Sequence, residues 1–309
     1  MARHDLPSGS VETRPGVAMK LEHPDAVTCC VFAPNGDGLL TGCRDGGLRL
    51  WDISTGRVSA TLSGHGGEIR SCQFSADGRL VLSASADGAL RLWQVHGRTF
   101  INVLELQVEA LRAGDLSPDG KLVAVVDNYR IYLGQSDDKI LLRSVSDFWG
   151  IWCCSFSRDA VTVFGGCDDG SIKCWEVSSG LLVRTLVGHR AAVHKCAVAR
   201  DGQYLLSAGW DACVRWWHIE TGECVHELPG HTDRVWSCAL APALPEGVSA
   251  AIDDTARVWD LVTGTCVAVL SGHALAVVDC AYSPDGSLIA TASFDRTACV
   301  WSAGDFRDR

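Results

Sequence analysis

The sequence predicts an all-β fold in which one four-stranded unit occurs seven times, and three observations lead to this prediction. An Asp recurs seven times along the 309 residues, each time six residues before a position that is Trp in six of the seven copies. Most neighbouring copies of that position lie 42 residues apart. Short β-prone segments alternate with turns that contain Gly or Asp. A fixed period in this range is typical of one unit repeated around an axis, and it favours binding over chemistry as the function.

The second unit shows how each element is expected to form. Residues 69–74 and 80–85 predict two strands, and Ser75-Ala76-Asp77-Gly78 between them predicts a tight turn, since Asp and Gly tolerate a positive φ. Residues 89–93 and 99–104 predict the third and fourth strands. One such sheet cannot bury both of its faces, whereas seven sheets packed radially bury one another.

The first strand of every unit is expected to contain a β-bulge. Counted from the opening residue of each unit, an aliphatic residue stands at offset four, and apolar residues recur at offsets seven and nine. Offsets seven and nine share one face of a strand, but offset four breaks this alternation. A bulge early in the strand restores it and turns the residue at offset five outward. The opening residues are His23, His65, Gln107, Asp147, His189, His231 and His273.

Motifs at fixed places in the repeat make the chain resemble the WD40 repeat family over roughly residues 17 to 301. The resemblance implies a seven-bladed β-propeller of four-stranded antiparallel blades, closed by an N-terminal strand from Val17 to Leu21 that completes the last blade. It divides the chain into a flexible N-terminal tail at 1–16, the propeller at 17–302 and a short C-terminal tail at 303–309. The motifs are Gly188-His189, Gly230-His231, Gly272-His273, Ser117-Pro118-Asp119-Gly120, Ser283-Pro284-Asp285-Gly286, Trp51-Asp52 and Trp259-Asp260.

The composition limits the classes of partner and compartment. The chain has 27 Lys and Arg against 37 Asp and Glu, a formal charge of -10, so direct nucleic-acid binding is not expected. It has no apolar run of about 18 residues, and its first 16 residues are polar, so neither a membrane span nor a secretory signal is expected. The 15 Cys then predict reduced thiols in a cytoplasmic protein, with the nucleus or a cilium left open.

Six cysteines share offset seven of their units. Equivalent positions in neighbouring sheets are expected to lie about 10 Å apart, whereas a disulfide needs Cα atoms within about 7 Å. We therefore interpret these cysteines as small apolar residues inside a strand. No Cys-x-x-Cys pair or Cys/His quartet has ligand spacing, so neither a metal site nor a cofactor is expected. The six are Cys30, Cys72, Cys154, Cys196, Cys238 and Cys280.

Five units combine the opening His, a Ser or Thr four residues before the Asp, and the Trp. The combination imitates a catalytic triad, but five copies of one catalytic site would be peculiar, and the Trp indole offers only a donor. The family resemblance implies instead a buried hydrogen-bond network in each blade, so no catalytic residue is expected. These tetrads are His23, Thr41, Asp45 and Trp51; His65, Ser83, Asp87 and Trp93; His189, Ser207, Asp211 and Trp217; His231, Ser249, Asp253 and Trp259; and His273, Thr291, Asp295 and Trp301.

Units three and four depart from this pattern. Gln107 and Asp147 replace the opening His, Val123 and Gly165 replace the hydroxyl, and unit three also lacks the Trp. We expect these two blades to be the least rigid of the seven, or else to be stabilised by a partner. In unit six, residues 241–247 predict an enlarged turn.

A partner is expected on the propeller face where the bulges and one set of turns meet, since WD40 propellers commonly bind partners there. Aromatic residues gather at these positions on blades four to seven, and Arg on blades one to three. Trp and Arg dominate interface energetics, although the Trp rings could instead cap the propeller core. The expected contact residues are Trp152, Trp210, Trp236, Phe294, His194, Arg44, Arg70, Arg112 and Arg234.

These expectations favour a non-catalytic scaffold or adaptor that binds a peptide or loop of another protein, as a monomeric propeller within a complex. The sequence shows no Gly-rich phosphate loop, His-Glu-x-x-His or Gly-x-Ser-x-Gly motif, and no carboxylate cluster that would line the central channel. One alternative is a substrate-recognition subunit of a ubiquitin ligase, although the Trp-Asp-x-Arg motif common in such receptors is absent. Another is a fixed component of a large ciliary or chromatin-associated assembly.

Overall fold

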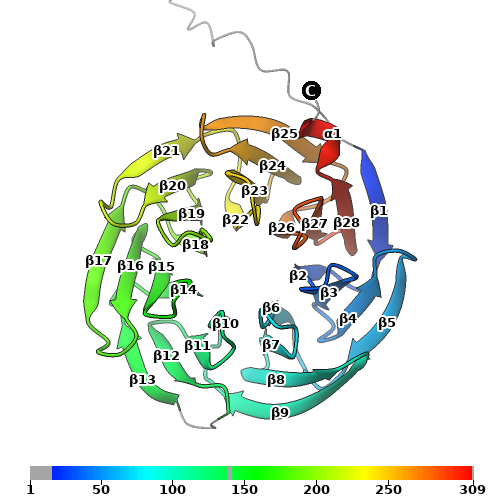
Figure 1. Ribbon diagram of the computed structural model, residues 1–309, viewed down its shortest axis with the longest axis horizontal. Helices are drawn as coiled ribbons and strands as arrows, with labels where there is room; N and C mark the ends of the chain where they lie inside the picture. The colour runs from blue at the N-terminus through cyan, green and yellow to red at the C-terminus, as the bar shows by residue number, and fades with distance from the viewer. Residues whose placement is uncertain (1–15, 138–140, 308–309) are drawn as a thin grey trace, which may run out of the picture.

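Seven four-stranded antiparallel sheets stand around a central axis as the blades of a propeller (Figure 1). The computed structural model describes residues 16–137 and 141–307, so nearly all of the N-terminal tail expected at 1–16 lies outside the described residues. Within six of the blades the chain runs from the strand nearest the axis to the strand at the rim, and then crosses to the next blade. The structure confirms the all-β, seven-bladed fold.

The strands occupy equivalent places in all blades. The inner strands are β2 (Val27–Phe32), β6 (Ile69–Phe74), β10 (Ala113–Leu116), β14 (Ile151–Phe156), β18 (Val193–Val198), β22 (Val235–Leu240) and β26 (Val277–Tyr282). The second strands are β3 (Gly38–Cys43), β7 (Leu80–Ser85), β11 (Leu122–Val126), β15 (Thr162–Cys167), β19 (Tyr204–Gly209), β23 (Glu246–Ala251) and β27 (Leu288–Ser293). The third strands are β4 (Leu48–Asp52), β8 (Ala89–His96), β12 (Arg130–Gln135), β16 (Ser171–Glu176), β20 (Val214–His218), β24 (Thr255–Asp260) and β28 (Thr297–Ser302). The outer strands are β5 (Arg57–Leu62), β9 (Thr99–Gln107), β13 (Leu141–Ser146), β17 (Leu182–Val187), β21 (Cys224–Leu228), β25 (Thr265–Ser271) and β1 (Val17–Glu22).

The N-terminal strand closes the ring, as the resemblance implied. β1 pairs antiparallel with β28, from Met19 opposite Val300 to Glu22 opposite Thr297. The last blade is therefore ordered β26-β27-β28-β1, with the two ends of the propeller held in one sheet. Since an open ring would expose the strand edge of β28, this pairing removes an unpaired edge.

The predicted bulges are present in six blades. In each of these blades the register of the inner strand shifts between offsets four and six, as between Ile69 and Ser71 in blade two. β10 of blade three begins only at Ala113, and its pairing with β11 shows no shift. The bulges turn the residues at offset five toward one face of the propeller, where they surround the mouth of the channel.

The core lies between the blades. Trp217, Trp259 and Trp301 are among the largest fully buried side chains, and Trp259 of blade six packs against Leu206 and Val214 of blade five. Each blade thus buries an apolar face that its own strands leave open, which is why the sheets are stable only as a ring.

The blade-six turn is not enlarged. Residues 241–245 connect β22 to β23, the same number that connect β6 to β7 in blade two. Ala243 and Leu244 stand where most other blades carry Asp and Gly, so this turn differs in composition but not in length. The prediction of an insertion was therefore wrong, because the residues of this turn change its composition and add nothing to its length.

Part of the segment expected as a C-terminal tail is packed against the propeller. Helix α1 (Gly304–Arg307) places Phe306 in the apolar core beside Tyr282 of blade seven. Arg307 Nη2 lies 2.6 Å from Glu246 Oε2 of blade six, and its Nη1 donates to the carbonyl of Gly286 at 2.8 Å. Among the described residues, no helix is long and apolar enough to span a membrane.

Candidate protein-binding face

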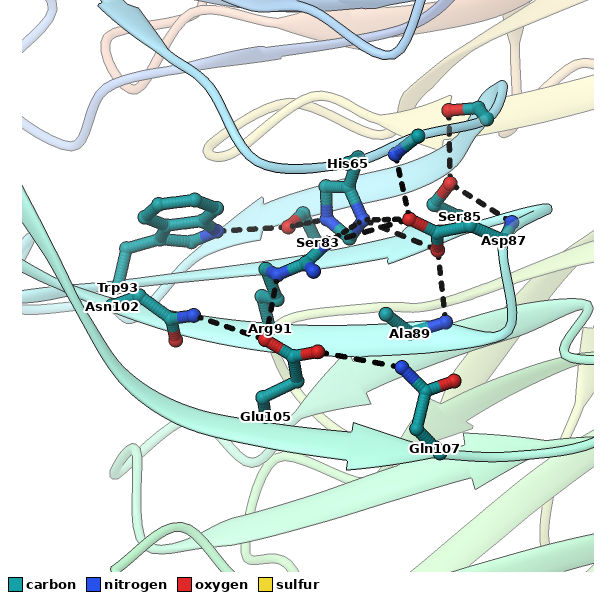
Figure 2. A network of polar contacts seen from close by, with 12 residues as sticks. His65, Ser83, Ser85, Asp87, Ala89, Arg91, Trp93, Asn102, Glu105 and Gln107 are labelled. Atoms are coloured by element: carbon teal, nitrogen blue, oxygen red, sulfur yellow. Dashed lines mark hydrogen bonds and ion pairs between the residues drawn. The ribbon is translucent and has the colours of Figure 1, made fainter.

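Four blades contain the complete tetrad. In blade five Trp217 Nε1 donates to Ser207 Oγ at 2.8 Å, and Ser207 Oγ lies 2.7 Å from His189 Nε2. His189 Nδ1 in turn lies 2.8 Å from Asp211 Oδ1. Figure 2 shows the equivalent chain in blade two, where the His65 to Asp87 contact is longer, at 3.3 Å. The same contacts join the tetrads of blades six and seven.

Blade one keeps only part of its tetrad. Trp51 Nε1 donates to Thr41 Oγ1, and this oxygen lies 2.9 Å from His23 Nε2. His23 Nδ1, however, donates to the Leu21 carbonyl at 3.0 Å, so the structure does not bring His23 and Asp45 together. Burial lowers the pKa of His23 to about 4, in a site where no carboxylate contacts the ring.

A basic residue four positions after the Asp is a member of the network that the sequence reading missed. In blade five Arg215 is almost fully buried, and its Nη1 donates to Asp211 Oδ2 at 2.7 Å. Burial opposes the charge of Asp211, but its bonds to His189 and Arg215 hold its pKa well below the usual range. An Arg or Lys at this offset in five of the seven units was the signal that could have found it.

Blades three and four hold the Asp turn by other means. In blade four Lys173 pairs with Asp147, which replaces the opening His, and lies 3.9 Å from Asp169. In blade three Asp127 accepts a hydrogen bond from the Tyr132 hydroxyl at 2.8 Å. The absent His and Ser are thus replaced by an ion pair in one blade and a phenol in the other.

The central channel is lined by the inner strands and has a cavity volume of about 620 Å³. Two aspartates, Asp115 of blade three and Asp279 of blade seven, line its wall. Asp279 Oδ2 accepts the backbone N–H of Cys30 at 2.9 Å, and Asp115 Oδ2 accepts that of Phe156 at 2.8 Å. Each carboxylate therefore satisfies an open edge of the next blade's inner strand. The missed signal was strand parity, since offsets six and eight must face away from the buried offsets seven and nine.

Charge in the channel is shared between these carboxylates and one lysine. Burial raises the pKa of Asp115 to about 6. Burial also opposes the charge of Lys195, but the attraction of Asp279 and other channel groups outweighs it and raises the pKa of the ammonium. The carboxylates hold backbone N–H groups and share one cation, an arrangement that stabilises the ring.

Four of the expected contact residues form one aromatic cluster at the mouth of the channel. Trp152 and Trp210 have ring centroids 4.7 Å apart. His194 lies within 4.4 to 5.8 Å of Trp152, Trp210 and Trp236. His194 Nδ1 donates to the Trp236 carbonyl at 2.8 Å, and burial lowers the pKa of the ring to about 4, so the imidazole is neutral at pH 7. All four side chains are half-buried.

Two guanidinium groups cap this cluster. Arg112 lies 3.7 Å from the Trp152 ring centroid, and Arg234 lies 4.8 Å from that of Trp210. These side chains therefore contact one another in the order Arg112, Trp152, Trp210, Arg234. This row of side chains, called the stack below, crosses from blade three to blade six. Buried Arg112 Nη1 and Trp210 Nε1 make no hydrogen bond to any other described residue. Both atoms are donors, so the stack offers hydrogen bonds that only an acceptor from outside this part of the chain would use.

The three remaining expected residues lie apart from the stack. Arg44 lies 5.1 Å from the ring centroid of Phe294 and 3.9 Å from a Glu68 carboxylate oxygen. Arg70 Nη1 donates to the Leu111 carbonyl at 2.7 Å. Eight of the nine residues therefore form an Arg-capped aromatic cluster on blades three to six and a smaller Arg44–Phe294 pair between blades seven and one, and Arg70 belongs to neither group.

An exposed aromatic corner adjoins the stack and was not predicted as part of it. Phe148 and Trp149 lie in the connection between β13 and β14 and are 85% and 57% exposed. Tyr129 in the adjacent turn is 57% exposed, and its carbonyl accepts the Asp147 N–H. Its neighbour Asn128 accepts a hydrogen bond from Arg112 Nε at 2.8 Å, which connects the corner to the stack. The sequence signal available for this corner was its location, since Phe148 and Trp149 lie in the connection that leads into the inner strand of blade four.

No group of three or more His, Cys, Asp or Glu side chains in the described part of the chain is arranged to hold a metal ion. Five of the six cysteines at offset seven are buried inside their strands, and Cys72 is half-buried. All 15 Cys are free thiols.

Comparison with protein families agrees with this architecture. The model of the WD domain, G-beta repeat (WD40) matches residues 17–52, 56–94, 139–176, 180–218, 222–260 and 264–302, well over half of the chain. No curated protein matches the chain. Residues 95–138, which the family model leaves unmatched, include the first three strands of the atypical blade three. Six matched repeats in a seven-bladed propeller place this chain in the WD40 repeat family, whose members generally mediate protein interactions.

Proposed function

We propose that the protein is a non-catalytic scaffold that binds a peptide or loop of another protein over the aromatic stack at the mouth of the channel. The observation that carries this proposal is the stack itself, with the unpartnered donors of Arg112 and Trp210 inside it. Half-buried Trp rings flanked by Arg are the residue types that dominate binding energy at interfaces. Unsatisfied buried donors favour a ligand that brings acceptors, such as carboxylates or backbone carbonyls.

The charges around the stack favour an acidic segment in the partner. Arg234, Arg44 and Arg70 are exposed around the channel mouth, although Glu68 and Asp168 lie among them. Trp152 Nε1 already donates to Asp168 Oδ1 at 2.9 Å, which shows that a carboxylate fits beside this ring. An acidic side chain of the partner would bind next to Arg112 or Arg234 in the same manner.

The test is affinity capture from native lysate with wild type and a Trp152→Ala/Trp236→Ala variant. A matched control, Val183→Ala/Val187→Ala, removes two exposed apolar side chains from the outer strand β17. We expect a partner that wild type and the control retain and the Trp variant loses. Equal retention by all three proteins would contradict a site on the stack.

A second variant tests the charge of the partner. Arg234→Glu reverses one cap of the stack and leaves the Trp rings in place, so it is expected to weaken an acidic partner at least tenfold. Binding of the captured partner, measured by titration at two salt concentrations, should weaken with salt for wild type. Undiminished binding by Arg234→Glu would contradict an acidic segment.

The same capture experiment also shows which kind of assembly contains the protein. Ubiquitin-ligase subunits among the retained proteins would favour a substrate receptor, and ciliary or chromatin proteins would favour a fixed assembly component. The 15 free thiols support a reducing compartment such as the cytoplasm.

A further inference from the structure

Two pairs of cysteines lie at the wall of the central channel, and the two members of each pair come from neighbouring blades. Cys29 Sγ of β2 lies 3.3 Å from Cys72 Sγ of β6. Cys153 of β14 and Cys196 of β18 occupy the same two positions of the repeat and pack in one buried cluster between blades four and five. In both pairs offset six of one blade meets offset seven of the next, a combination that the spacing argument for offset seven alone does not cover. All four residues line the channel as free thiols.

A glycine makes room for the sulfur in each pair. A Cβ at Gly42 of β3 would lie 2.6 Å from Cys29 Sγ, and one at Gly166 of β15 would lie 2.9 Å from Cys153 Sγ. In the other blades with the regular spacing, offset six is Ser, Lys or Asp, and the position of the glycine is Ala84, Ala208, Ala250 or Ala292. The combination of Cys, Gly and a Cys in the next blade thus occurs twice, and in both places the two cysteines pack in one cluster.

The two pairs differ in the charge that faces them. Lys195 stands on β18 next to Cys196, and besides the bond from Cys196 its positive charge contributes to lowering the pKa of Cys153. The pKa of Cys29 is raised by its bond with Cys72, by burial and by the negative charge of Asp279. Since the thiolate is the nucleophile, the pair beside Lys195 is the more reactive of the two.

We propose that Cys153 and Cys196 form a redox-active dithiol, which a hydroperoxide that enters the central channel oxidises to a disulfide between blades four and five. The Cys153 thiolate attacks one oxygen of hydrogen peroxide, so that an S–O bond forms and the O–O bond breaks. The departing hydroxide takes the proton that Cys153 released and leaves as water. Cys196 then attacks Sγ of the sulfenic acid, the S–S bond forms, and the S–O oxygen leaves with the Cys196 proton as a second water.

The site lies directly beneath the aromatic cluster. Cys153 follows Trp152 in β14, and Cys196 stands two residues after His194 in β18. The disulfide would therefore join the two strands that carry the Trp152–His194 contact. The inference does not depend on the proposed binding function, because it concerns the thiols themselves.

The test exposes the full-length protein to a limiting amount of hydrogen peroxide, blocks the remaining thiols with N-ethylmaleimide and maps cross-linked tryptic peptides. Residues 196–200 form a peptide with one cysteine, and residues 144–158 carry Cys153 and Cys154. We expect the link between these two peptides to form several-fold faster than the Cys29–Cys72 link in the same molecule, because the charge of Lys195 favours the thiolate of Cys153. Cys153→Ser should abolish the link, and Cys154→Ser should leave it.

The role of Lys195 is tested separately. Lys195→Gln is expected to slow formation of the link several-fold, while Lys195→Arg keeps the charge and stays near the wild-type rate. Thermal unfolding confirms that each variant is folded, and if Lys195→Gln is not, the wild-type comparison between the two pairs decides. Equal rates for the two pairs, a link that persists in Cys153→Ser, or a folded Lys195→Gln variant with an unchanged rate would each overturn the proposal.

Discussion

Blades five and four are neighbours in the ring, and they hold the same turn with different chemistry. Blade five uses His189, Ser207 and Trp217 around Asp211, with Arg215 buried against the same carboxylate. In blade four Asp147 stands at the position of the His, and Lys173 lies near the carboxylates of both Asp147 and Asp169. The strands of the two blades are nonetheless equivalent in position and pairing. The repeat therefore requires that the turn be held to its neighbours, and more than one network can do so.

The family model also tolerates the absence of the tetrad from a blade. The model of the family matches blade four, which lacks the His and the hydroxyl, but leaves residues 95–138 unmatched. Those residues include β10 to β12 of blade three, which the structure shows as a complete sheet together with β13. The spacing of strands and turns thus defines a blade even where the polar residues that recur in the other blades are missing.

The largest expected effect comes from removing the turn carboxylate of blade five. Asp211→Ala leaves Arg215 as a buried cation without its main partner, and we expect a loss of about 3 to 5 kcal/mol in unfolding free energy. Asp127→Ala in blade three removes hydrogen bonds but leaves no buried cation without a partner, so a loss of about 1 kcal/mol is expected. Urea unfolding of both variants measures the difference. Equal losses would show that the two networks contribute alike.

Blade four should depend on its lysine. Lys173→Met leaves Asp147 and Asp169 near one another without the cation between them, and a loss of about 2 kcal/mol is expected, because the site is only partly buried. Lys121→Met, at an exposed lysine that pairs with Asp119 in a turn, is the control and should be nearly neutral. If both variants unfold at the same urea concentration as wild type, the ion pair does not replace the tetrad.

Acid should weaken the His-containing blades before the others. The pKa of His23 falls from its usual 6.5 to about 4 in the folded protein, so below pH 6.5 the unfolded chain takes up the proton first. Stability is therefore lost as pH falls from about 6.5 to 4, by on the order of 1 to 2 kcal/mol at pH 5. His23→Gln should flatten this dependence. The depressed pKa of Asp87, about 2, adds a further loss only below about pH 4.

Hydrogen exchange can assign that loss to particular blades. After correction for intrinsic exchange rates, protection in β3 and β4 should fall between pH 7 and pH 5, and protection in β11 and β12 should change less. Blade three has no His at its opening position to take up a proton. Equal loss of protection in both blades would mean that the ring opens as one unit and that its blades are not separately titrated.

The smallest expected effect comes from an attempt to restore the tetrad in blade four. A Cβ at Gly165 would lie 2.8 Å from the Trp175 ring, so the hydroxyl position is already filled. Gly165→Ser is therefore expected to destabilise the protein by about 1 kcal/mol, and the double variant with Asp147→His, which also removes the partner of Lys173, by more. A rise in melting temperature for the double variant would show that blade four can adopt the network of blade five.

The sequence by itself determined the number of blades, the boundaries of the first two strands of the second unit, the inner-strand bulges of six blades and the closing strand. These features repeat along the chain at a fixed spacing, and local turn chemistry and strand alternation are sufficient to specify them. It also placed the tetrad residues, although it gave His23 a carboxylate partner that it lacks. Only the tertiary structure decided which residues of different blades touch.

The contacts between blades account for what the sequence missed. Spacing gives the position of each residue in its own blade, but the distance between blades follows from how the sheets pack around the axis. The Arg112 to Arg234 stack, the Asp279 bond to Cys30 and the thiol pairs all cross that gap. Helix α1 likewise depends on a pocket formed by blades six and seven. A repeat thus encodes its own strands, whereas the site exists only once the ring has closed.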